Sequence, residues 1–283
     1  MVNWIFDDGA LAQFRNAGYL RVKIDELTQA RVRDVYSAAA KFFQLSPDEK
    51  LGDALAFDAG YRPFGTEYSQ APDRPDLMES FSTSYQVKDA EDALRSTPGK
   101  RLHRAMRALH DVFEPLAEEF IVRLADTIGG LGFGERFRGA LHEWSILQVN
   151  HNIRLDSSIS CINDLHEDAC LISLVSNTGP GLEFQHPDGS FSPVSIADNE
   201  VLLIPGEVLW LLTGGTIMPL YHRVVRPNPI RDRMALLFFA DPEPTMCSPW
   251  IESDINKGID IGARVRTNPL LIGLKERAGE SDG

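Results

Sequence analysis

The second half of the chain constrains the fold most, because it consists of short apolar runs separated by turn residues. These strand-like runs lie at residues 144–150, 170–175, 182–185, 201–204, 208–212, 223–225 and 234–240. Between two of them, His186-Pro-Asp-Gly189 places proline and glycine where a hairpin turn favours them. Many short strands at this spacing predict a sandwich or jelly roll rather than a parallel sheet, with no further helix after about residue 140.

The first half of the chain has the patterns of helices. Apolar residues recur at three and four residue spacings over residues 25–45 and again over residues 99–128. The sequence Ser46-Pro-Asp-Glu49 is a capping box with proline at the first helical position, so a short helix is predicted to start there. We expect Pro115 to kink the long helix or split it in two, and Gly129-Gly130 to end it.

No repeat or low-complexity linker divides the 283 residues, and we expect one integrated domain. Residues 56–75 combine glycines and prolines with aromatic residues, which indicates an ordered loop rather than a flexible linker. A polar tail is expected only after about residue 275.

The charge of the chain argues against some classes of partner. The 41 acidic residues outnumber the 28 basic ones, giving a net charge of −13, whereas nucleic acids and anionic membranes require clustered lysine and arginine. The apolar runs are too short to span a bilayer, and Asp7 and Asp8 interrupt any N-terminal secretory signal. The 3 cysteines show no Cys-x-x-Cys spacing, so we expect a protein of the reducing cytoplasm.

Three residues have the chemistry of a metal site. His166 and Asp168 are two positions apart, so on an extended strand both side chains project from the same side. His222 lies in a later apolar run. Taken singly, the first two are compatible with an ordinary surface pair and His222 with a hydrogen-bonded core histidine. Together, two histidines and one carboxylate form the facial triad of non-haem Fe(II) oxygenases, although zinc or nickel also suits these ligands.

A zinc-protease helix is excluded, because the residue four positions after His166 is Cys170 rather than histidine. Phosphate-binding glycine loops and the serine nucleophile elbow are also absent from the sequence.

Arg233 stands at the head of the last strand-like run. A guanidinium group there can bind a carboxylate through two parallel hydrogen bonds, as in a dicarboxylic cosubstrate or an amino-acid substrate. The alternative is a solvated arginine within the basic stretch 226–233.

The order His166, Asp168, His222 and Arg233 resembles the isopenicillin N synthase-like branch of the Fe(II)/2-oxoglutarate-dependent dioxygenases. The resemblance extends over residues 5–245. It includes the opening glycine-aromatic strand at residues 17–22, the helix end at 42–50, the loop and strand at 60–65 and 76–81, the glycine-leucine turn at 179–182 and the closing strand at 238–242.

This resemblance implies a mostly β protein with N-terminal helices, whose core is a double-stranded β-helix, or jelly roll, flanked by helices. The helical and strand region would comprise residues 1–100, the oxygenase core with its long supporting helix residues 101–245, and a C-terminal tail residues 246–283. His166, Asp168 and His222 would bind Fe(II), and 2-oxoglutarate would chelate the metal. The reaction would use O2, release succinate and CO2, and oxidise a small molecule. An aspartate at the second ligand position leaves no site for chloride, which argues against halogenation.

Arg233 would bind the distal carboxylate of 2-oxoglutarate, with Asn150 and Asn152 nearby. Two hydroxyl groups of the family's cosubstrate site are replaced, by Ala235 after the arginine and by Asn152 where tyrosine is usual. These departures leave open an oxidase of the isopenicillin N synthase type, which uses no 2-oxoglutarate. A non-catalytic β-helix that binds a small molecule is a third possibility.

The resemblance places Tyr61, Arg62 and Phe239 in the substrate pocket. Aromatic walls with one arginine would suit a small acid or an amino-acid-derived natural product. Packing of the loop is the alternative role for these residues.

Overall fold

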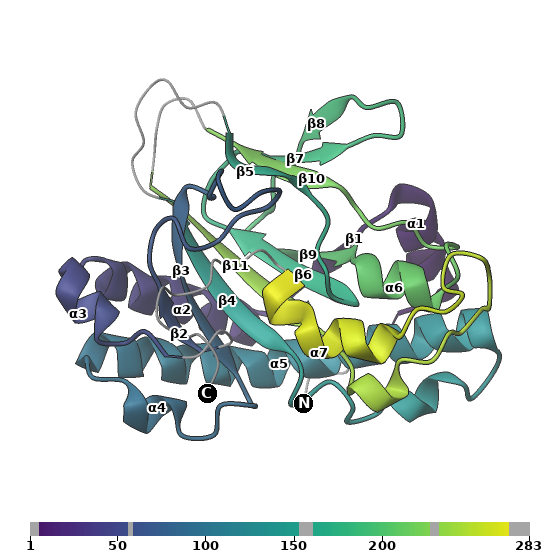
Figure 1. Cartoon of the computed structure of the whole chain (residues 1–283), viewed down its shortest axis with the longest axis horizontal. Helices are drawn as coiled ribbons and strands as arrows, with labels where there is room; N and C mark the ends of the chain where they lie inside the picture. The colour runs from purple at the N-terminus through teal and green to yellow at the C-terminus, as the bar shows by residue number, and fades with distance from the viewer. Residues whose placement is uncertain (1–5, 56–58, 153–160, 227–231, 272–283) are drawn as a thin grey trace.

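The structure, a computed structural model, describes residues 6–55, 59–152, 161–226 and 232–271. Two antiparallel sheets dominate this part of the chain (Figure 1). The major sheet has seven strands in the order β1-β9-β6-β11-β4-β3-β2, and the minor sheet four in the order β5-β10-β7-β8. The sheets form a double-stranded β-helix flanked by helices, which confirms the predicted fold class.

Six of the seven predicted apolar runs overlap strands, namely β4, β6, β7, β9, β10 and β11, whereas β5 and β8 match none of the predicted runs. The bounds of the strands in the major sheet are β1 Leu20–Lys23, β2 Gly60–Arg62, β3 Met78–Ser84, β4 Ile146–Asn152, β6 Ile172–Asn177, β9 Glu200–Pro205 and β11 Arg233–Ala240. In the minor sheet they are β5 Cys161–His166, β7 Leu182–Gln185, β8 Phe191–Pro193 and β10 His222–Val225.

The central strand β11 shows how the sheet divides the interior. It pairs with β4 on one side and β6 on the other, so both of its backbone edges are bonded. Leu236 and Phe238 are fully buried in the main hydrophobic core, whereas the alternate residues Ala235, Leu237 and Phe239 line a cavity between the sheets. This period of two is what a strand covered on both faces requires.

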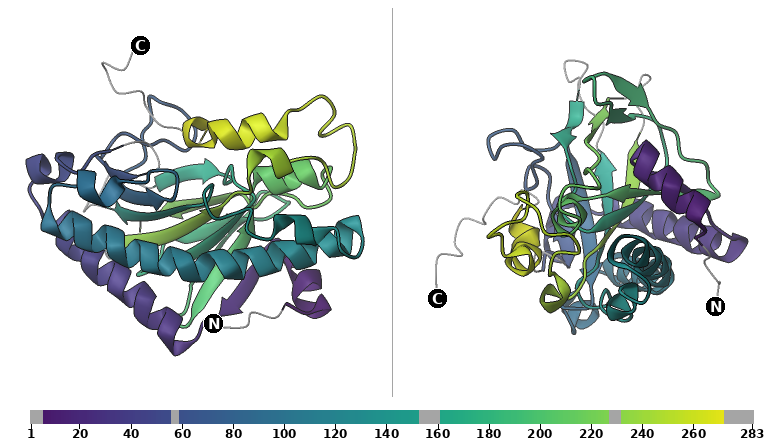
Figure 2. Two further views of the ribbon diagram at one scale, coloured as in Figure 1. Left: turned by 90° about the horizontal axis from the view of Figure 1, so that it is seen from below. Right: turned by 90° about the vertical axis from the view of Figure 1, so that its right-hand side faces the viewer.

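Helices α2 (Glu26–Phe43) and α5 (Thr97–Gly129) pack together against one face of the major sheet (Figure 2). Each begins with a side-chain cap, from Asp25 and Ser96, and α5 ends at Gly129 with Gly130 as its C-cap, as predicted. Of the two outcomes expected at Pro115, a kink or a split, the split does not occur, because α5 continues through the proline as one helix of 33 residues. Pro115 is exposed, so its ring lies away from the core.

Shorter helices complete the first half. They are α1 (Asp8–Ala17), α3 (Pro47–Leu51) and α4 (Ala90–Ala93). The capping box predicted at Ser46 and Glu49 is present in both directions at the start of α3.

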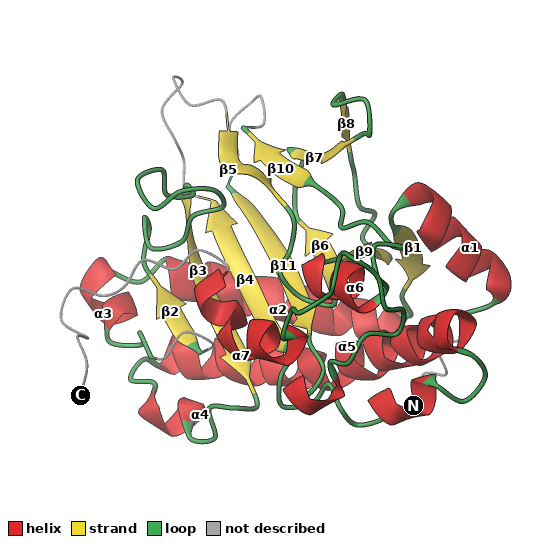
Figure 3. Cartoon of the chain, turned by 45° about the vertical axis from the view of Figure 1, so that its right-hand side comes forward, coloured by secondary structure: helices red, strands yellow, loops and turns green. Residues whose placement is uncertain are grey.

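Two helices after residue 140 correct the prediction that this region is purely strands and loops (Figure 3). Residues 208–212, predicted as a strand, belong to α6 (Glu207–Leu212), and α7 (Ile261–Leu271) packs on α6 and on the turn Pro244–Met246. The run of residues in α6 is apolar on every side, so periodicity cannot distinguish a buried helix from a buried strand there. The polar segment predicted after residue 275 lies outside the described residues.

The hairpin predicted at residues 186–189 connects β7 and β8, and the amide of Gly189 donates to the carbonyl oxygen of His186. All 3 cysteines are free thiols. Within the described residues, every helix is too short or too polar to pass through a bilayer.

Candidate active site

The three predicted metal ligands meet where β5 and β10 pair. His222 lies directly opposite His166 in the register of these strands. Nε2 of His166 and Nε2 of His222 lie 3.9 Å and 3.8 Å from Oδ1 of Asp168. Two metal bonds of about 2.1 Å can span such separations, so one ion can reach all three atoms.

The backbone prepares both imidazoles as neutral ligands. Nδ1 of His166 bonds the carbonyl oxygen of Asp164 at 2.7 Å, and Nδ1 of His222 bonds that of Leu220 at 3.0 Å. A carbonyl only accepts, so the proton is on Nδ1 and the lone pair of Nε2 faces the other ligands. Burial, reinforced by the neighbouring His166, lowers the pKa of His222, which keeps this ring unprotonated.

Asp168 lies just after β5, and two elements hold it. The hydroxyl of Ser173 donates to its Oδ2 at 2.5 Å, which leaves Oδ1 toward the histidines. The amide of Glu207, in the first turn of α6, donates to the carbonyl oxygen of Asp168 at 2.8 Å. A Cβ atom at Gly206 would overlap the carbonyl oxygen of Cys170, so glycine permits this close packing of α6 on the ligand loop.

Arg233 lies in the same cavity, on β11 of the facing sheet. It is only 3% exposed, and no carboxylate within the described ranges pairs with it. Its Nη1 donates to Oδ1 of Asn152 at 3.1 Å, but Nε of Arg233 and Nδ2 of Asn152 are buried and have no hydrogen-bond partner among the residues that the structure describes. Burial lowers the pKa of Arg233 to about 10, so the group stays charged at neutral pH. Two orphaned donors beside a buried cation fit an anionic ligand that would satisfy them.

The cavity that joins these groups has an empty volume of about 960 Å³, including its opening to solvent. Residues of both sheets line it, so it lies between them. Its apolar wall comes from Val175, Leu182, Phe184, Ile204, Leu237 and Phe239.

Comparisons with known proteins agree with this site. No model of a known protein family matches the chain. The chain is 23% identical to homoarginine-6-hydroxylase 2-ODD-233 of Oryza sativa subsp. japonica, over 80% of this chain and 74% of that protein. It is also 23% identical to a 2-oxoglutarate-dependent dioxygenase of Didymella fabae, over 80% of this chain and 76% of that protein.

Solved structures share the fold. A full-length Neurospora crassa protein in complex with alpha-KG gives a TM-score of 0.74 at 20% identity, covering 93% of this chain and 89% of that one. JOX2 in complex with 2OG, Fe and JA gives 0.71 at 17% identity, covering 85% and 73%. The similarity to dioxygenases along most of the chain and the assembled triad decide the assignment. The chain belongs to the superfamily of Fe(II)/2-oxoglutarate-dependent oxygenases.

In this oxygenase, two residues predicted in the substrate pocket lie elsewhere. Tyr61 packs its ring on Phe42 in the main core, and its hydroxyl donates to Glu79 at 2.7 Å. Arg62 is buried beside the cavity and forms an ion pair with Glu67 at 3.2 Å. Tyr61 points to the side of the sheet that α2 covers, whereas Arg62, the next residue of β2, points to the opposite side, where Glu67 holds it. Of the residues that the structure describes, the cavity lining includes neither of these two.

Phe239 and Asn150 do line the cavity, as does Ala235. Asn152 is not one of the described residues that line the cavity, but it accepts a hydrogen bond from Arg233, which does. With Ala235 and Asn152, the two expected hydroxyls are absent, and the amide of Asn152 is the polar group beside the arginine.

Three acidic or polar residues of the site are not predicted as site residues by the sequence, although Asp76 begins the segment 76–81 that resembles the family. Ser173 holds the metal-ligating carboxylate, and Glu67 and Asp76 line the cavity. Ser173 is a serine within an otherwise ordinary apolar strand. Glu67 and Asp76 come from a loop, and the sequence does not predict the path of that loop. The pairing of β3 with β4 and hydrogen bonds from Gln70 and Leu77 to carbonyl oxygens of β5 hold that loop at the cavity.

Proposed function

We propose that this protein oxidises a small molecule, in a reaction in which His166, Asp168 and His222 bind Fe(II) and Arg233 binds the distal carboxylate of 2-oxoglutarate. The observation that carries the proposal is the buried, partly unsatisfied guanidinium of Arg233 in the cavity that also contains the triad. In an oxidase that does not use 2-oxoglutarate, the guanidinium of Arg233 would need a carboxylate of the substrate as its partner.

When bound, iron and 2-oxoglutarate supply O2 activation, with decarboxylation of the cosubstrate to succinate and CO2. The chain itself supplies position and environment. The carbonyl partners of the two histidines hold both Nε2 atoms on one side, and Ser173 keeps one oxygen of Asp168 directed at them. The apolar wall excludes water from the reacting groups.

The relatives support a small organic substrate. The rice protein is named for homoarginine, the Neurospora crassa protein was solved with thymine, and JOX2 with JA. Hydroxylation of a compound in this size range, in the reducing cytoplasm where the free thiols are stable, is the expected role.

Succinate production tests the proposal. Purified protein with Fe(II), 2-oxoglutarate and O2 should release succinate slowly even without a substrate, and Asp168→Ala should abolish the release by removing a metal ligand. Asp198→Ala, which removes an exposed carboxylate, is the matched control and should retain it. Iron binding without succinate release in the wild type would favour the oxidase instead.

A further inference from the structure

Asp76 is a buried carboxylate without a cation. It lines the cavity, is 6% exposed, and accepts a hydrogen bond from the hydroxyl of Ser69 at 2.7 Å. No lysine or arginine of the described ranges forms an ion pair with it. Neutral partners alone compensate poorly for the cost of burying a charged carboxylate.

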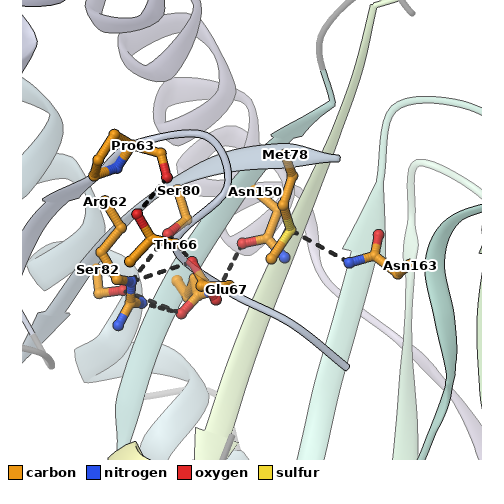
Figure 4. A network of polar contacts seen from close by, with 10 residues as sticks. Arg62, Pro63, Thr66, Glu67, Met78, Ser80, Ser82, Asn150 and Asn163 are labelled. Carbon is orange, nitrogen blue, oxygen red and sulfur yellow. Dashed lines mark hydrogen bonds and ion pairs between the residues drawn. The ribbon is translucent and has the colours of Figure 1, made fainter. Parts of the chain in front are cut away.

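The neighbouring Glu67 is already neutralised. Arg62 pairs with it at 3.2 Å, Ser80 donates to Oε1, and Gln148 donates to Oε2 at 3.1 Å (Figure 4). The same Arg62 also donates to Ser82 and Gln148. This arginine is therefore held by the wall of the cavity and is not available to a substrate carboxylate.

The polar side of the cavity, to which Glu67 and Asp76 belong, lies close to the metal ligands. Asn163 is on β5, three positions before His166, and its amide donates to Met78 at 3.4 Å (Figure 4). The pKa of Asp76 is raised: burial is the largest cause and the charge of Glu67 adds to it, whereas the hydrogen bonds from Ser69 and Asn163 and the proximity of His166 lower it. Asp76 is thus within electrostatic range of the metal site on one side and of Glu67 on the other.

The charges of the cavity do not cancel: acidic residues remain without a compensating cation in the described part of the chain. With iron and 2-oxoglutarate bound, their charges offset each other, and Asp168 and Arg233 do the same. Apart from these groups and the Arg62–Glu67 pair, the charged lining residues are Asp76 and Glu167, both acidic. Within the described ranges, Arg233 is the one arginine or lysine that lines the cavity.

We propose that Asp76 selects the substrate, and that the substrate presents a protonated amidine, guanidine or amine to it. This inference rests on the proposed function, because it concerns the substrate half of the same cavity. It replaces the acid-binding pocket expected from Arg62, whose charge Glu67 neutralises. A cation close to Asp76 would form a charge-assisted hydrogen bond, and a carboxylate there would be repelled.

Three probes of the same shape test the charge preference: pentanamidinium, pentanamide and pentanoate. Each is titrated by calorimetry, without O2, into protein loaded with Fe(II) and 2-oxoglutarate, and again into metal-free protein. We expect pentanamidinium to bind at least about tenfold more tightly than pentanamide, and pentanoate most weakly. Equal affinities, or tightest binding of pentanoate, would overturn the proposal.

Asp76→Asn removes the charge and keeps the shape. It should weaken pentanamidinium binding by about tenfold and leave pentanamide unchanged. Asp73→Asn is the matched control, because Asp73 is an exposed carboxylate of the same loop, and it should bind like the wild type. An unchanged preference in Asp76→Asn would show that Asp76 is a structural acid only. If this variant does not fold, the three wild-type titrations still decide the question.

The visible band of iron-chelated 2-oxoglutarate is recorded on the same samples. It distinguishes a failure of the proposed cosubstrate from a failure of the proposed role of Asp76. A normal band with no preference for pentanamidinium refutes the role of Asp76 alone. A missing band refutes the proposed cosubstrate, while the metal-free titrations still test the charge preference.

Discussion

Ser173 is the residue through which the major sheet controls the metal site. Its hydroxyl donates to Asp168 at 2.5 Å and fixes which carboxylate oxygen faces the two histidines. Partners of this kind orient metal ligands and are worth about 10–100-fold in metal affinity or activity.

We therefore expect Ser173→Ala to weaken Fe(II) binding by about 10–100-fold without loss of the fold. Ser176→Ala is the matched control: Ser176 is on the same strand but contacts Tyr36 of α2 on the opposite face. Equilibrium titration with Fe(II) measures both variants. Equal affinity in the two would show that Asp168 orients itself without Ser173.

The candidate metal ligands and the arginine of the cavity could be predicted from the sequence, because their residue types are characteristic of such a site. His166, Asp168 and His222 assemble as expected, and Arg233 lies in the same cavity. The positions of Ser173, Glu67 and Asp76 at the site could not be predicted, because strand register and the path of a loop bring them there. Tyr61 and Arg62 show the converse, since their place in the family pattern did not reveal that β2 turns them toward internal partners.

Among the elements, α5 carries an unusual cost. Pro115 lies in its interior and is exposed, so a proline there removes one backbone hydrogen bond without a visible gain in packing.

Pro115→Ala should raise the free energy of unfolding by about 1–3 kcal/mol, because alanine restores the amide and has the highest helix propensity. Urea denaturation of both proteins measures this. An unchanged or lower stability would mean that the proline contributes through the unfolded chain or through contacts along the helix.

Helix α5 also makes the protein sensitive to acid. His110 is fully buried, packs its ring on Phe238, and is bonded through Nε2 to the carbonyl oxygen of Ser145 at 3.3 Å. Burial lowers the pKa of His110 to about 4, below its value of about 6.5 in an unfolded chain. Between these values the unfolded state binds more protons, so stability is complete above about pH 6.5 and falls as the pH decreases toward 4.

We expect His110→Phe to lose less stability than the wild type between pH 7 and pH 5, because the unfolded variant gains no proton at this position. Chemical denaturation at the two pH values gives the comparison. An equal loss in both proteins would assign the acid sensitivity to other groups, such as His103, whose pKa burial also lowers to about 4.

Hydrophobic periodicity predicts some helices of this protein and not others. The amphipathic helices α2 and α5 were predictable because one face is apolar. Helix α6 is apolar on every side after Glu207, so its residues 208–212 have the pattern of a buried strand, and α7 contains Gly262 and Pro269, which weaken a helical pattern. Tertiary packing decides both helices, and a single sequence does not record it.

At the scale of the whole molecule, the site exists only where the two sheets face each other. The minor sheet supplies both histidines, and the major sheet supplies Arg233 and, through Ser173, the support for Asp168. Ligands that engage both sheets should therefore stabilise the native state as a unit.

Fe(II) alone should raise the free energy of unfolding, and 2-oxoglutarate should raise it further, by about 2.7 kcal/mol when its concentration is 100 times its dissociation constant. Anaerobic denaturation with each addition measures both increments. An increment from 2-oxoglutarate that does not depend on iron would indicate binding outside the metal site.

Binding of 2-oxoglutarate to iron in this cavity, with its distal carboxylate on Arg233, can be followed in a single titration. Apo-protein is titrated without O2, first with Fe(II) and then with 2-oxoglutarate, while the visible charge-transfer band of the chelated cosubstrate is followed. The wild type should develop the band, and Arg233→Ala should need about 10–100-fold more 2-oxoglutarate to reach half its intensity. If iron binds but no band appears at high 2-oxoglutarate, this cavity does not bind 2-oxoglutarate on iron.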